Sequence, residues 1–254
     1  MSSFINAILA FVELEARRLK YNRTELYTRA VQPILWLVVF GPVMARIKAL
    51  PTNGIPYVAF ITPGVIMQSV TFVSIFYGLT IVWERESGIL KKLLTMPVSR
   101  ISIVLGRSSA SIIRALFQFV IITPIALALG VRVEPNPAYL LLSLFIVVIT
   151  AIGFSAFSIW IASYMKTRER FMGIGQAITM PLFFASNAIY PISIMPTPIK
   201  VIVLINPLTY AVDALRKTMI IGVLNGLVID LLALIIFTVL FIILASIGFK
   251  RIIE

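Results

Sequence analysis

The chain has 254 residues, of which 60% are hydrophobic and 13% are charged, and its net charge is +12. A water-soluble domain of this length does not tolerate so apolar a composition, so the sequence predicts a membrane protein. The chain contains no cysteine and no histidine. Disulfides, thiolate chemistry, and the commonest metal ligand and general base are therefore excluded, and we expect no catalytic residue and no metal site.

Six apolar stretches divide the sequence. A bilayer core about 30 Å thick needs about 20 apolar residues per helix, and only the first stretch is slightly short of this length. The stretches are continuously apolar and do not alternate with period two, which argues against transmembrane β-strands. The sequence predicts one all-α membrane domain over residues 1–254, with spans at 30–45, 57–83, 103–129, 138–165, 172–190 and 227–249.

The basic residues are distributed unevenly between the two ends of these spans. Fifteen Lys and Arg residues lie on the side of the two termini, six lie on the opposite side, and Arg114 lies within a span. The positive-inside rule then makes both termini cytoplasmic. The net charge thus reflects membrane topology, and we expect a multi-pass protein of the cell membrane that contacts lipids and binds no nucleic acid.

Residues 1–29 precede the first predicted span. Apolar side chains such as Phe4, Ile8 and Phe11 indicate a helix that lies in the cytoplasmic membrane interface. Glu13 and Glu15 are expected to mark the point where this interfacial helix enters water.

The densest run of charge, "WERESGILKKLLTMP" at 83–97, lies between the second and third spans. On a helix, Ile89, Leu93 and Met96 fall on one side, and the acidic residues precede the lysines, as the helix dipole favours. Pro97 ends the pattern. An amphipathic cytoplasmic helix is predicted over 84–97. The pattern alone is equally compatible with a helix lying on anionic headgroups and with a helix that docks into a soluble partner.

Polar residues follow one face of the third span. Ser99 or Ser102 can cap this helix, and Arg107, Arg114 and Gln118, spaced seven and four apart, lie close to one face. An arginine inside the bilayer is costly and faces protein, water or an acid. Arg114 either snorkels to the cytoplasmic headgroups or lines a gate on a route across the membrane.

The connection 191–226 is long, apolar and interrupted by prolines. It contains two helical candidates too short to cross the bilayer alone, at 199–205 and 207–221. Asn206 can cap the second of them with Pro207 at its first position, and Gly222 can end it. A further crossing would place the C-terminal basic residues outside, so we predict an external re-entrant helical hairpin.

Ionisable side chains continue through this hairpin into the last span. Asp213 can pair with Arg216 or Lys217 at spacings of three and four. Close to lipid such a pair neutralises a costly carboxylate, although ordinary surface ion pairs have the same spacing. Asp230 is expected at the membrane interface.

Two distant stretches resemble the type 2 ATP-binding-cassette (ABC) exporter permeases. The first is "ERESGILKKLLTMPVSR", followed by a Gly-Arg helix start at Gly106 and Arg107, and the second is "NPLTYAVDALR" preceded by "YPISIMPTPIK". The stretch "LLTMPVSR" is more similar to the multidrug branch of this family, which includes daunorubicin-resistance permeases, than to the exporters of polysaccharide or teichoic acid.

This resemblance implies a permease that is not itself an enzyme. Such a subunit works as a dimer with two copies of a separate cytoplasmic ATPase, which binds the ATP and Mg, and it exports an amphipathic drug or lipid-like substrate. The sequence contains no G-x-x-x-x-G-K-[ST] phosphate loop, in agreement with this division of labour. A lipid-linked glycan as substrate, an ATP-independent channel and a membrane-embedded lipid enzyme are the alternatives.

The resemblance also implies two groups of functional residues. The helix that docks into the ATPase, called the coupling helix, comprises Glu84, Arg85, Glu86, Gly88, Ile89, Leu90, Lys91 and Leu93. The external re-entrant segment, 191–226, contains Asn206, Pro207, Tyr210, Asp213 and Arg216. A third group follows from the polar face of the third span, where a gate or translocation route is expected at Arg107, Arg114 and Gln118.

Overall fold

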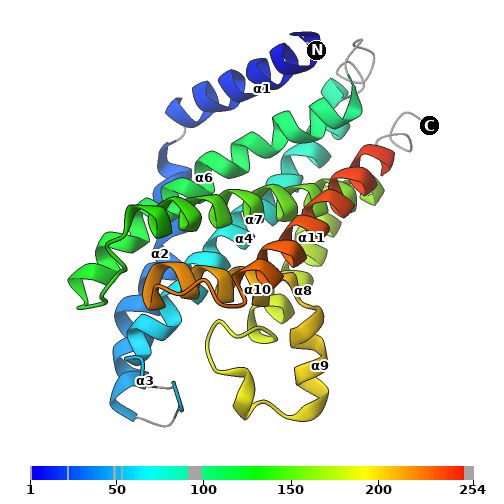
Figure 1. Cartoon of the computed structure of the whole chain (residues 1–254). Coiled ribbons are helices and arrows are strands. Elements are labelled where there is room, and N and C mark those ends of the chain that lie inside the picture. Colours follow the sequence, from blue (N-terminus) through cyan, green and yellow to red (C-terminus); the bar gives the residue numbers. More distant parts are fainter. Residues whose placement is uncertain (1, 22, 48–49, 53, 91–98, 249–254) are drawn as a thin grey trace.

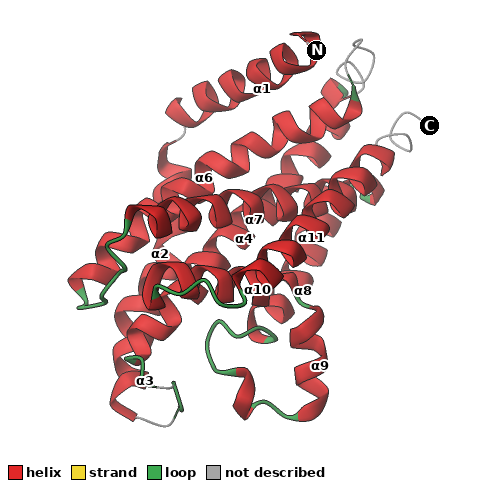
Figure 2. Ribbon diagram, in the orientation of Figure 1, coloured by secondary structure: helices red, strands yellow, loops and turns green. Residues whose placement is uncertain are grey.

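A computed structural model describes residues 2–21, 23–47, 50–52, 54–90 and 99–248 (Figure 1). All regular elements in these ranges are helical, as Figure 2 shows. The predicted all-α class is therefore confirmed. The helices are α1 (Ser2–Tyr21), α2 (Arg23–Leu35), η1 (Trp36–Phe40), α3 (Gly41–Ile47), α4 (Tyr57–Glu86), α6 (Arg100–Ala128), α7 (Pro137–Tyr164), α8 (Arg168–Phe184), η2 (Ile192–Ile194), α9 (Thr197–Ile205), α10 (Pro207–Arg216), η3 (Lys217–Ile221) and α11 (Leu227–Gly248).

Five of the predicted spans form helices that are long and apolar enough to cross a membrane. They are Leu26–Ile47, α4, α6, α7 and α11. The first begins four residues earlier than predicted, because α2 continues without interruption from the polar stretch into the apolar one. Its middle, η1, is a π-helix that follows Pro33, a residue that cannot donate a backbone hydrogen bond.

Contacts between helix ends define one end of the bundle, which we call the termini end. The Arg85 guanidinium donates to the Met165 carbonyl oxygen over 3.1 Å, and Arg168 pairs with Glu86 over 2.8 Å. The end of α4, the end of α7 and the start of α8 therefore meet. The start of α1 and the end of α11 lie at this same end, at the upper right of Figure 1.

The opposite end of the bundle, which we call the hairpin end, is joined by two long-range contacts. The Tyr57 hydroxyl donates to the Ile189 carbonyl oxygen over 3.1 Å, and the Glu134 backbone N–H donates to the Met219 carbonyl oxygen over 2.9 Å. Residues 168–189 thus run from one end of the bundle to the other. Its helix, at 17 residues, is shorter than the five helices that are long and apolar enough to cross a membrane, so the predicted sixth span stays a prediction.

The predicted span 172–190 differs from α8 at both boundaries. The helix starts at Arg168, four residues earlier than predicted, and ends at Phe184. At its C-terminal end, carbonyl groups accept hydrogen bonds from the side chain of Asn206 in the hairpin. The Asn206 side-chain amide donates to the carbonyl oxygens of Leu182 and Ala185 over 2.7 and 2.6 Å. A side chain from the hairpin thus satisfies the acceptors that every helix leaves free at its C-terminus.

The predicted hairpin is the pair α9 and α10, bent by 81° at Asn206. Both ends of this pair lie at the hairpin end, since Ile189 precedes it and Met219 follows it. The contacts thus place both ends of the pair at one end of the bundle, and the re-entrant path in a membrane stays a prediction. As predicted, the Asn206 side chain accepts from the Leu208 N–H, and Gly222 ends the helix at φ +70°.

The close packing of α4 against the segment after α8 can be tested at Gly64. A Cβ atom there would lie 2.7 Å from the Cα of Ala188, whereas a Cβ atom at Gly173 would meet nothing within 4 Å. We expect Gly64→Ala to lower stability by about 1–3 kcal/mol through overpacking against backbone that cannot retreat. Gly173→Ala is the matched control and should raise the melting temperature slightly, because alanine favours helices. Thermal unfolding of both purified variants tests this, and equal stability would contradict it.

Candidate functional site

The predicted coupling segment does not form one helix. α4 ends at Glu86, residues 87 and 88 form a turn, and helical geometry resumes at Ile89. Gly88 has φ +74°, and the Ser87 N–H donates to the Trp83 carbonyl oxygen over 2.9 Å, so this is a glycine-terminated helix end. The prediction of a single helix starting at Glu84 is therefore corrected, because the left-handed glycine stops α4 first.

The side chains around this break face in different directions. Glu86, Ser87 and Ile89 are exposed, whereas Leu90 is fully buried in a hydrophobic core at the termini end that also contains Ile103. The described residues thus present a short exposed surface at the tip of α4, anchored by one leucine. Lys91 and Leu93, like all of 91–97, lie outside the described residues.

Glu84 belongs to a buried ionic group that we call the Arg107 cluster. The Arg107 guanidinium pairs with Glu84 over 2.8 Å and with Glu15 over 3.1 Å, and the Tyr77 hydroxyl donates to Glu15 over 2.9 Å. The Arg107, Glu84 and Glu15 side chains are each at most 8% exposed. Arg107 also lies over the Phe11 ring, 5.2 Å from its centre. The cluster therefore joins α1, α4 and α6.

The burial of Glu15 corrects the expectation that it marks an exit into water. α1 packs closely along α6 at Gly106, where a Cβ atom would lie 2.6 Å from the Phe11 ring. Glu15 is consequently carried inside, and Arg107 compensates its charge. The four-residue spacing between Phe11 and Glu15 was the signal for a shared face. Gly106 lies two turns inside α6, which starts at Arg100, so the expected Gly-Arg helix start is also corrected.

The predicted polar face of α6 is present and buried. Arg107, Arg114 and Gln118 are each at most 5% exposed. Arg114 lies over the Tyr77 ring, 5.5 Å from its centre, and the Gln118 amide donates to the Leu26 carbonyl oxygen over 3.4 Å. These side chains contact α4 and α2, so Arg114 does not snorkel to the headgroups. Ser99 caps the helix as predicted, since its side chain accepts from the Ser102 N–H.

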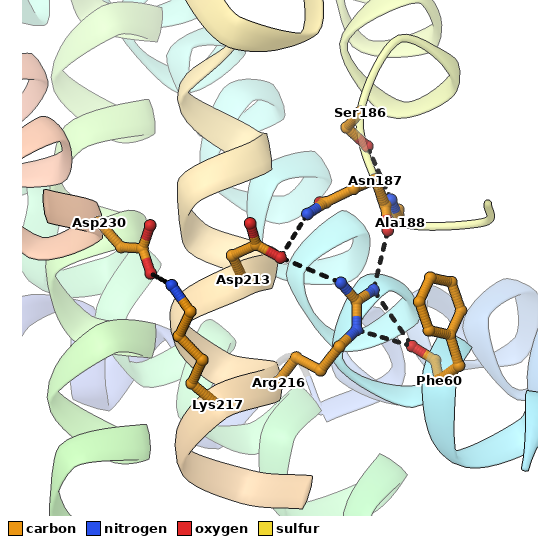
Figure 3. Close-up of polar contacts among 8 residues, drawn as sticks. All are labelled: Phe60, Ser186, Asn187, Ala188, Asp213, Arg216, Lys217 and Asp230. Carbon is orange, nitrogen blue, oxygen red and sulfur yellow. Dashed lines mark hydrogen bonds and ion pairs between the residues drawn. The ribbon is translucent and has the colours of Figure 1, made fainter. Parts of the chain in front are cut away.

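A second buried group, the Arg216 cluster, holds the hairpin against the bundle (Figure 3). The Arg216 guanidinium donates to the Phe60 carbonyl oxygen over 3.2 and 3.3 Å and to the Asn187 carbonyl oxygen over 2.8 Å. It pairs with Asp213 over 3.1 Å, and the Asn187 amide also donates to Asp213. The Cζ atom of Arg216 lies 4.0 Å from the centre of the Phe60 ring. One arginine thus ties α10 to α4 and to the segment after α8.

The remaining predicted hairpin residues take separate roles. Lys217 pairs with Asp230 of α11 over 2.6 Å, so Asp213 pairs only with Arg216 of its two predicted partners. Asp230 is buried inside the protein, and its expected place at the membrane interface stays a prediction. The Tyr210 hydroxyl donates to the Leu204 carbonyl oxygen over 2.7 Å, across the α9–α10 bend. Pro207 opens α10.

This architecture matches a known family over most of its length. Residues 6–220 match the model of the ABC-2 type transporter family. The chain belongs to this family, and it is therefore the membrane-spanning permease subunit of an ABC transporter, a multi-pass protein of the cell membrane.

Three individual relatives share between 21% and 29% of their aligned residues with this chain. A Cyanophora paradoxa protein named as the transport permease ycf38 is 29% identical over 84% of this chain and 74% of its own length. The daunorubicin resistance ABC transporter permease protein DrrB1 of Streptomyces coeruleorubidus is 21% identical over 85% of this chain and 75% of its own length. A protein of Escherichia coli strain K12 named as the multidrug ABC transporter permease YbhR is 28% identical over 63% of this chain and 44% of its own length.

Proposed function

We propose that this permease exports an amphipathic drug or lipid-like compound, driven by ATP that a separate cytoplasmic ATPase hydrolyses. The observation that carries the proposal is the exposed tip of α4, residues 86–89, standing directly beside the buried Arg107 cluster. Relatives named for multidrug and daunorubicin resistance support the substrate class. The working unit is a homodimer of this chain with two ATPase subunits, which bind the ATP and Mg.

Force enters at the α4 tip and passes through the Arg107 cluster. Glu84 lies two residues before Glu86, where the exposed tip begins, and pairs with Arg107, which in turn binds Glu15 of α1. A displacement of the tip therefore moves α1, α4 and α6 together, because separating these charges inside a low-dielectric interior is costly. In this proposal Arg107 is a positioning residue, and Arg114 and Gln118 keep α4 and α2 in register with α6.

The hairpin closes the other end of the route. α10 is bound to α4 through the Arg216 cluster and to α11 through the Lys217–Asp230 pair. Movement of α4 relative to α11 therefore strains the hairpin, because the hairpin is bound to both helices. Release of these contacts opens the external end, and their reformation closes it.

Ile89 provides the test of docking. It is 51% exposed at the α4 tip, and Ile101, 44% exposed in the first turn of α6 at the same end, is its matched control. We expect Ile89→Glu to weaken binding of the cognate ATPase by about tenfold or more, since interface anchors contribute at least about 1.4 kcal/mol. Ile101→Glu should stay within about twofold of wild type by the same conversion.

Pull-down titration and stimulated ATP hydrolysis measure this effect. Equal binding of wild type and Ile89→Glu would remove the α4 tip from the docking site. Flux in vesicles that proceeds without ATP would instead favour a channel.

A further inference from the structure

A groove on the outside of the bundle stands apart from both ionic clusters. It has a volume of about 710 Å³, and α7 forms its floor, α8 and α11 its two walls, and the α9–α10 bend its end. The lining residues Leu240, Ile202 and Ile205 are 49%, 56% and 76% exposed. The groove therefore opens sideways, toward the surroundings of the bundle, which are lipid in a membrane.

The groove is notably aromatic. Four of its thirteen lining residues are phenylalanine, whereas aromatic residues make up 11% of the chain. Phe154 and Phe237 lie 5.0 Å apart between ring centres, Phe157 and Phe241 4.8 Å, and Phe237 and Phe241 4.9 Å. The rings form one connected surface from α7 to α11. Ring faces and edges in this arrangement attract a further aromatic ring beyond the effect of buried area.

The size of the groove is that of a small-molecule site. Binding sites for small molecules have volumes of about 300–1,000 Å³ and are mostly apolar. The groove meets both criteria, since twelve of its thirteen lining side chains are apolar. A compact apolar ligand therefore fits it.

The polar part of such a ligand stays outside the groove. Asn206 is the lining side chain with hydrogen-bonding groups, and its amide already binds Leu182 and Ala185 while its oxygen accepts from Leu208. It has little capacity left for a ligand. The groove thus takes the apolar body of an amphipathic compound and leaves its polar group at the open side.

We propose that this groove binds the planar aromatic body of an amphipathic compound that enters from the membrane. This inference rests on the proposed export function and names both the site and the substrate class. Ile202, Ile205 and Asn206 line the groove and also form the bend of the hairpin. A bound ring system therefore touches the element that closes the external end, so occupancy of the groove biases the position of the hairpin.

Filling the groove tests the proposal without removing core packing. Ala177 is an exposed lining residue of α8, and Val239 is an exposed residue of α11 that does not line the groove. Ala177→Phe should raise the Kd for doxorubicin about tenfold or more, as loss of ring contacts and of buried area predicts. Val239→Phe adds the same phenyl group elsewhere and should stay within about twofold of wild type.

A second pair of variants tests the ring contacts themselves. Phe157→Leu keeps the apolar character of the groove floor but removes one ring, and should raise the Kd roughly three- to tenfold. Phe145, on the same helix and 48% exposed, lies outside the groove, so Phe145→Leu is the matched control. Both titrations use the purified full chain in lipid nanodiscs, with doxorubicin fluorescence anisotropy as the readout.

Three results overturn the proposal: doxorubicin that does not bind wild type, Ala177→Phe that binds it as wild type does, and Ala177→Phe that loses co-purified phospholipid but keeps doxorubicin binding. The last result would make the groove a lipid site. These titrations contain neither ATPase nor ATP. A failure of the export function would appear as flux in vesicles that does not depend on ATP, and the two failures are therefore distinguished by separate measurements.

Discussion

Arg107→Met is expected to destabilise the protein by about 3–5 kcal/mol, because it leaves two buried carboxylates without their common partner. Glu15 and Glu84 would then face each other inside the bundle, at 0% and 8% side-chain exposure. Thermal unfolding of the purified chain measures the loss. The control is Arg17→Met, which removes the exposed Glu13–Arg17 pair of α1, where about 0.5 kcal/mol or less is expected.

A compensated variant separates charge from packing. Adding Glu15→Gln and Glu84→Gln to Arg107→Met removes all three charges and should recover most of the stability, since neutral amides cost far less to bury than carboxylates. Coupling should stay impaired in this variant even though the fold is restored, because the ionic link from the α4 tip to α1 is gone. Wild-type stimulation of ATP hydrolysis in the compensated variant would show that the Arg107 cluster only stabilises the fold.

The second large effect is expected at Arg216. Its guanidinium makes hydrogen bonds to two backbone carbonyl oxygens and to Asp213, and such charge-assisted bonds contribute about 1.5–3 kcal/mol each. Arg216→Met should therefore release α10 from α4. The chain has no cysteine, so Thr209→Cys on buried α10 reports opening directly through reaction with a water-soluble maleimide.

We expect Arg216→Met to raise the labelling rate at position 209 by about tenfold or more, a change of about 1.4 kcal/mol in the opening equilibrium. Arg216→Lys keeps the charge but cannot reproduce the planar fork, so its rate should fall in between. Arg132, an exposed arginine in the α6–α7 connection, is the control position, and Arg132→Met should leave the rate unchanged. Equal rates in all variants would show that the cluster does not hold the hairpin closed.

Features with a local cause were predictable from the sequence. Hydropathy located the long spans, the spacing in α6 predicted the shared face of Arg107 and Gln118, and the Asn-Pro pair predicted the start of α10. The Asp213–Arg216 pair follows in the same way from its three-residue spacing. Each of these features depends on residues within a few turns of one another.

The two ionic clusters could not be predicted in full, because their members come from distant parts of the chain. Arg216 donates to the backbone carbonyl oxygen of Phe60, 156 residues away. A pattern of side chains cannot predict which distant backbone carbonyl accepts a hydrogen bond. The break at Gly88 was not predicted. A helical pattern across 84–97 and a left-handed glycine within it conflict, and the glycine determined the structure.

The Arg107 cluster also has a consequence for biosynthesis. Glu15 lies 62 residues before Tyr77 and 92 residues before Arg107, so the ribosome delivers its carboxylate long before either partner exists. α1 therefore cannot complete these contacts until α4 and then α6 have been made. A chain truncated before Arg107 would leave the buried carboxylate of Glu15 without its arginine partner.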